Sequence, residues 1–111
     1  MAQHLSEESK AMIALCDSVK QLTRDCEFTE SEKLIADAMR LYPHAPQPHN
    51  LMGVLLETMH DHIAAVKHFR AAWSLDPTYL PARHNLNNFA SFYPRGKLAY
   101  DEHDCLLNEN K

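Results

Sequence analysis

The stretch FRAAWSLDP at residues 69–77 repeats the pattern of IADAMRLYP at residues 35–43, which lies 34 residues earlier. Each stretch begins with a large apolar residue, has a small residue three places on, and carries a leucine two places before a final proline. Proline disfavours helical backbone in the residue before it and cannot donate a backbone hydrogen bond, so each stretch has the pattern of a helix end. Two similar helix ends at this distance raise the hypothesis of a helical repeat.

The same spacing relates positions outside the two quoted stretches. When the chain is compared with itself at this offset, apolar positions fall on apolar positions, small on small, and proline on proline. A period between about 20 and 50 residues is typical of proteins built from stacked structural repeats. The coinciding positions are Pro43 with Pro77, Ala38 with Ala72, Leu41 with Leu75, Ile35 with Phe69, Met52 with Leu86, and the series Ser31, Ala65, Ala99 and Leu22, Leu56, Ala90.

The composition favours helices throughout. The 111 residues are enough for one domain, and they include only two glycines and no Asn-Gly pair that would form a hairpin turn. Apolar residues at three- and four-residue spacing predict an all-α chain of three helix pairs. The predicted helices run from Leu5 to about Arg24, from a capping box at Thr29 and Glu32 to Tyr42, from Pro46 to about Met59, from Asp61 to Leu75, from Leu80 to Tyr93, and from Lys97 to about Asn108.

The charge pattern argues against several classes of partner. The formal net charge is −4, and lysines and arginines are scattered singly, unlike the basic surfaces that bind nucleic acid or anionic membranes. No apolar run approaches the length of a membrane span, and the N-terminus lacks the hydrophobic region of a signal peptide. Three cysteines without clustered spacing indicate free thiols in a reducing, cytoplasmic compartment.

The middle repeat resembles the tetratricopeptide repeat family. The family pattern is W-x2-L-G-x2-Y, then A-x3-F, then a further alanine and a later proline, over 34 residues. The spacing in this chain is the same, without insertion. Five positions match outright, namely Gly53, Ala65, Phe69, Ala72 and Pro77, and three carry residues of compatible size, namely His49, Met52 and Leu56.

The resemblance is weaker in the two flanking repeats. The three repeats span about residues 12–45, 46–79 and 80–111, and together they make one domain over residues 1–111. In the third repeat Asn87 takes the glycine position and His103 the phenylalanine position, as expected of a divergent capping pair whose outer face meets water. The resemblance implies an α-solenoid of three antiparallel helix pairs wound into a right-handed superhelix.

No pattern in the sequence indicates a catalytic site, a cofactor site or a metal site. His60, Asp61 and His62 form the tightest cluster, but they fall in the turn between two predicted helices, where solvated polar residues are expected. Cys16 lies beside Asp17, and a neighbouring acid raises a thiol pKa rather than activating it as a nucleophile. The chain is therefore expected not to be an enzyme.

The resemblance points instead to a peptide-binding surface. In the family, the first helix of each pair lines a concave groove, which implies that residues from three helices face a ligand here. Asn50 and Asn88 each offer an amide donor and acceptor suited to an extended peptide backbone, so replacing both by alanine is expected to weaken capture with little change in melting temperature. The implied groove residues are Lys20, Gln47, Asn50, Val54, Glu57, His84, Asn88 and Ser91.

One subfamily binds chaperone tails through a clamp of lysine, asparagine and arginine residues on successive first helices. Lys20, with Asn85 or Asn88, matches part of this clamp. Cys16 and Pro81 occupy positions where the clamp has basic residues, and so does Asn85. A chaperone C-terminal tail is therefore not the first expected ligand.

The expected function is a non-catalytic protein-interaction module that binds a peptide or helix partner in its groove. Two alternatives stay open. The chain could form a homodimer through apolar residues of its last predicted helix, or it could be the regulatory end of a larger enzyme. The apolar residues in question are Leu98, Tyr100, Leu106 and Leu107.

Overall fold

The computed structural model describes residues 6–90 and 96–109, and within these ranges the protein is all-α, as predicted, with no strand. Leu5 and Tyr93, the predicted limits of two helices, lie outside the described residues. The helices are α1 (Glu7–Arg24), α2 (Phe28–Leu41), α3 (Pro46–Thr58), α4 (His62–Leu75), α5 (Leu80–Phe89) and α6 (Glu102–Glu109).

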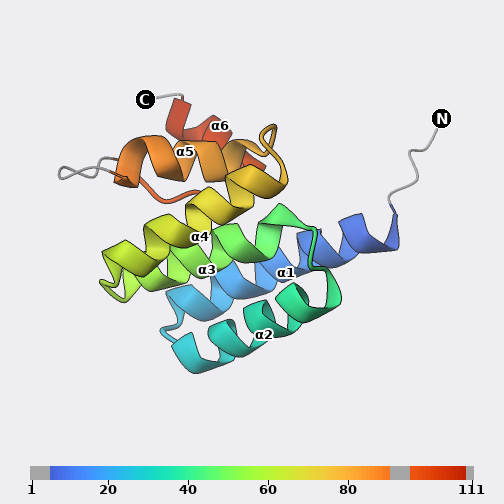
Figure 1. Ribbon diagram of the computed structural model, residues 1–111. Helices are drawn as coiled ribbons and strands as arrows, with labels where there is room; N and C mark the ends of the chain where they lie inside the picture. The colour runs from blue at the N-terminus through green and yellow to red at the C-terminus, as the bar shows by residue number, and fades with distance from the viewer. Residues whose placement is uncertain (1–5, 91–95, 110–111) are drawn as a thin grey trace.

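Each helix packs against the next one in the chain. Figure 1 shows the stack running from α1 and α2 at one end to α5 and α6 at the other. In addition, α1 contacts α3 and α3 contacts α5, so the three odd-numbered helices form one continuous layer. The most extensive packing is between α3 and α4, which makes this pair the centre of the molecule.

The 34-residue spacing recurs in the backbone. The only non-glycine residues with positive φ in the described chain are Cys26 (φ 60°) and His60 (φ 68°), which follow α1 and α3 at equivalent places. The hydrogen bonds around them also correspond, since Glu27 N–H donates to Leu22 O and Asp61 N–H donates to Leu56 O, both at 2.8 Å. The turns of the first two helix pairs are therefore built alike.

The start of α2 differs from the prediction. The expected capping box at Thr29 and Glu32 is wrong, because α2 begins at Phe28 after Glu27, whose side chain makes no capping bond. The Ser31 amide donates instead to the Glu27 carbonyl, so Thr29 is already inside the first turn. In contrast, Asp61 caps α4 as expected, by accepting a bond from the Ala64 amide.

The C-terminal part of the chain also differs from the prediction. The last helix was expected to begin at Lys97, but α6 begins at Glu102, and residues 96–101 are not helical. The physical reason is that the backbone N–H and C=O of Ala99 are both bound by side chains of other helices and cannot enter a helical ladder. Similarly, α5 ends at Phe89, before the predicted end.

The α3–α4 pair is held by direct contact between Gly53 and the ring of Phe69. Phe69 is fully buried together with Val54, Ala65 and Phe89. A Cβ atom added at Gly53 would lie 2.5 Å from Cδ1 of Phe69 and closer still to Cε1. The absence of a side chain at Gly53 therefore determines how closely the two helices approach.

Replacing Gly53 by alanine is expected to destabilise the protein, although the same change usually stabilises a helix by up to about 1 kcal/mol. The clash with Phe69 should reverse the sign and lower the free energy of unfolding by about 1–3 kcal/mol, measured by urea denaturation. The control is Phe69→Leu with and without Gly53→Ala. If the two changes prove additive in this double-mutant cycle, the clash is not the cause.

His49 of α3 and His68 of α4 form a second contact within the same pair. Their Nδ1 atoms are 3.3 Å apart and the rings are stacked, with centroids 5.5 Å apart. Burial lowers the pKa of both imidazoles, and His49 lowers the pKa of His68 further. The contact therefore needs at least one neutral ring, since two protonated rings would oppose donor to donor.

This pair is expected to make stability depend on pH. Because the folded-state pKa values are depressed, the stabilisation is complete above the unfolded value of about 6.5 and is lost as the pH falls through the folded values. His68→Gln should therefore reduce the fall in free energy of unfolding between about pH 7.5 and 5. The exposed His44 provides the control, and an equal effect of His44→Gln would contradict the assignment.

Candidate functional site

Two buried asparagines hold the backbone of one residue near the C-terminus. Asn50 of α3 and Asn85 of α5 are fully buried. Both Nδ2 atoms donate to the Ala99 carbonyl oxygen at 2.9 Å, and Asn85 Oδ1 accepts the Ala99 N–H at 2.8 Å. Asn85 Nδ2 also donates to Asn50 Oδ1 at 2.9 Å, which links the two amides. Both backbone polar groups of Ala99 are therefore bound by side chains of other helices.

Lys20 of α1 forms ion pairs with two aspartates that follow Ala99 within a few residues. Its Nζ lies 3.3 Å from Asp101 Oδ2 and 3.0 Å from Asp104 Oδ1, and 5.6 Å from the centre of the Tyr100 ring. Burial lowers the pKa of Lys20, but Asp104 and Asp101 outweigh it and raise the pKa above its usual value. Lys20 is therefore held as a cation between two carboxylates.

The two aspartates also shape the chain locally. Asp101 Oδ1 accepts the Asp104 N–H at 3.1 Å, which caps the start of α6. Asp104 Oδ2 accepts the Tyr100 N–H at 3.0 Å. These bonds place both carboxylates toward Lys20 just where the non-helical residues 96–101 lead into α6.

His84 of α5 binds the chain on the N-terminal side of Ala99. Its Nε2 lies 2.9 Å from the Lys97 carbonyl oxygen and acts as the donor. Residues 97–104, called the C-terminal segment below, therefore cross the odd-numbered helices from α5 through α3 to α1. This course explains why α6 ends up beside α5 while contacting α1 through Lys20 (Figure 1).

The structure brings together three of the predicted groove residues, because Lys20, Asn50 and His84 all bind the C-terminal segment. Asn88 contacts His84 at 3.3 Å, and Gln47 lines a nearby pocket.

The remaining predicted residues lie elsewhere. Glu57 pairs with His62 Nδ1 at 2.8 Å, on the turn side of the α3–α4 pair. Val54 does not face a groove, because it is fully buried in the core against Phe69. Ser91 lies outside the described residues.

Asn85 was not among the predicted groove residues, although the sequence carries a signal for it. At the 34-residue offset Asn85 corresponds to Leu51, which is fully buried. A polar side chain in a core position requires a buried hydrogen-bonding partner. The signal predicts a partner but not that the partner is Ala99, which lies 14 residues further on.

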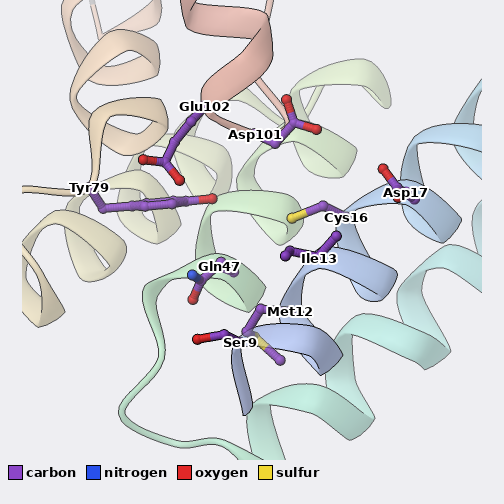
Figure 2. A pocket seen from close by; sticks show the side chains of 9 residues that line it. All are labelled: Ser9, Met12, Ile13, Cys16, Asp17, Gln47, Tyr79, Asp101 and Glu102. Atoms are coloured by element: carbon purple, nitrogen blue, oxygen red, sulfur yellow. The ribbon is translucent and has the colours of Figure 1, made fainter. Parts of the chain in front are cut away.

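A pocket of about 290 Å³ remains open beside the C-terminal segment. Figure 2 shows the hydroxyl of Tyr79 directed across it toward the sulfur of Cys16, with the two acidic residues of the C-terminal segment on one side and Gln47 on the other. The lining residues are Ser9, Met12, Ile13, Cys16, Asp17, Gln47, Tyr79, Asp101 and Glu102.

The thiol of Cys16 and the phenol of Tyr79 in this pocket are protonated near neutral pH. Burial raises the pKa of Cys16 to about 12, and nearby Asp101 and Asp17 add to the effect. Burial also raises the pKa of Tyr79, and the Cys16 thiol adds to it. The pocket therefore presents a neutral thiol and phenol next to apolar atoms of Met12 and Ile13.

Among residues 6–90 and 96–105, no group of three or more His, Cys, Asp or Glu side chains is placed to hold a metal. His62 pairs with Glu57, and Asp61 caps α4, so two members of the His60–His62 cluster have structural partners. None of the described cysteines forms a disulfide, and Cys16 and Cys105 are buried whereas Cys26 is exposed.

In the described part of the chain, no helix has the length and apolar character needed to cross a membrane. Comparisons of the chain with protein-family models, with curated proteins and with solved structures find no match.

Replacing Asn85 by alanine is expected to lower the melting temperature. It would leave the Ala99 N–H and Asn50 Oδ1 without their partner, at about 1–3 kcal/mol for each buried group left unsatisfied. Asn50→Ala should also destabilise, which corrects the sequence-based expectation that this residue could be replaced with little effect. The matched control is Asn88→Ala, where the side chain is partly exposed, and equal melting temperatures for Asn85→Ala and Asn88→Ala would refute the role of the buried pair.

Proposed function

We propose that the chain is a tetratricopeptide-like α-solenoid that acts, without catalysis, as a protein-interaction module. The proposal is supported by the 34-residue period, which appears both in the sequence and in the matching turns at Cys26 and His60. The layer of α1, α3 and α5 corresponds to the first helices of the three pairs. The absence of a disulfide among the described cysteines fits a reducing environment, and we place the protein in the cytoplasm.

The observation that carries the proposal is the binding of the Ala99 backbone by Asn50 and Asn85. Recognition of a peptide requires donors and acceptors aimed at backbone groups, together with a space that takes side chains. The asparagines of the odd-numbered layer supply the donors and acceptors, and the adjacent pocket supplies the space for a side chain. We propose that the partner is a peptide segment that contacts this layer and inserts an apolar side chain against Met12 and Ile13.

The alternative of a homodimer through the last helix receives less support. Leu98 and Tyr100 are partly buried against the protein's own core, which leaves less apolar surface for a second copy. The side chains of Leu106 and Leu107 lie outside the described residues. We therefore place peptide binding first and self-association second.

The proposal is tested by a matched pair of isoleucine variants. Ile13 lines the pocket and is 52% exposed, whereas Ile63 is 73% exposed on α4 and does not line the pocket. Ile13→Asp should weaken partner binding by at least tenfold, or about 1.4 kcal/mol, because it places a carboxylate where an apolar group binds. Partners are captured from a lysate with the wild type, identified, and titrated calorimetrically against both variants.

Both substitutions are at exposed positions, so each should change the free energy of unfolding by no more than about 0.5 kcal/mol. The melting temperatures should therefore stay nearly unchanged. Ile63→Asp should bind the partner as the wild type does. If the two variants capture the same proteins with the same affinity, the pocket is not the binding surface and the proposal fails.

A further inference from the structure

We infer that the C-terminal segment is an internal ligand of the peptide site, and that the external partner is an acidic peptide which replaces it. The partner would carry a small residue, with acidic residues two and five positions later, as Ala99 is followed by Asp101 and Asp104. This inference rests on the proposed function, because it names the class of peptide that the same site accepts.

The small residue follows from the burial of Ala99. Its side chain is fully buried while both of its backbone groups are bound by asparagine amides. A larger side chain at this point would have to displace atoms of the core, which overpacking disfavours. In contrast, the hydrogen bonds from the asparagine amides contact only backbone atoms. They therefore place no further requirement on the sequence of the peptide.

The acidic residues follow from the position of Lys20. Its ammonium group is partly buried and lies within 3.3 Å of two carboxylates. A peptide without acids at these positions would leave a partly buried cation without a partner, which is unfavourable. Asp104 is the closer of the two and also binds the Tyr100 amide, so the second acid contributes to both charge and backbone shape.

The internal segment competes with an external one because it belongs to the same chain. A tethered ligand has an effective concentration in the range of about a millimolar. The apparent affinity for an external peptide is therefore the intrinsic affinity multiplied by the fraction of molecules in which the site is open. Weakening the contacts of the internal segment without altering the site should raise the apparent affinity.

The experiment uses the full chain and a fluorescent peptide with the sequence of residues 97–104, KLAYDEHD, blocked at both ends. The loosened chain carries Asp101→Asn and Asp104→Asn, because asparagine keeps the capping bonds and loses the charge. By fluorescence anisotropy, the loosened chain should bind the peptide at least tenfold more tightly than the wild type does. Adding Lys20→Met to the loosened chain should remove this gain.

Two controls separate charge loss from general damage. Glu102→Gln removes an exposed carboxylate from the same region, where no ion pair to Lys20 is formed, and should leave peptide affinity at the wild-type level. A peptide with tryptophan in the place of Ala99 should lose binding to the loosened chain. Circular dichroism establishes that each variant retains its helices.

Hydrogen exchange of the Ala99 amide in the wild-type chain gives a second readout that needs no variant. Asn85 protects this amide, so excess peptide should accelerate its exchange by displacing the internal segment. Equal peptide affinity of the wild type and the loosened chain, with unchanged exchange at Ala99, would overturn the inference. The proposed function fails by a different result, namely equal partner capture by Ile13→Asp and Ile63→Asp.

Discussion

The arrangement of the helices depends on the contact of Phe69 with Gly53. Because Gly53 has no side chain, α4 lies close against α3, and the Phe69 ring fills the space between them. Helix α3 in turn contacts α1, α2, α4 and α5. A change in the distance between α3 and α4 would thus shift the one helix that most of the others touch, and with it the position of Asn50.

The buried asparagines connect this core to the C-terminal segment. A fully buried amide needs all of its polar atoms bonded, and among the described residues no buried side-chain nitrogen or oxygen lacks a partner. At Asn50 and Asn85 the partners include the backbone of Ala99, from a part of the chain far away in sequence. The hydrogen bonds that pair these buried amide groups therefore also hold the C-terminal segment against the odd-numbered helices.

The sequence predicted the first five helices well because their signals are local. Apolar spacing, the prolines and Asp61 all act within a few residues, and the predictions that failed were the capping box at Thr29 and the end of α5. The start of α6 could not be found in this way, since Ala99 has the small-residue spacing of Ser31 and Ala65 but is bound by amides from two other helices.

The candidate site was predictable to the extent that the repeat pattern assigns faces to helices. Lys20, Asn50 and His84 do share one surface, whereas Val54 turns into the core because Phe69 needs a neighbour. The occupant of the surface depends on contacts that span 13 to 84 residues, which no local spacing encodes. In a chain whose helices mainly touch their neighbours, each end can fray on its own. The ion pair between Lys20 and Asp104 joins the first helix to the last, so we expect it to couple the unfolding of the two ends.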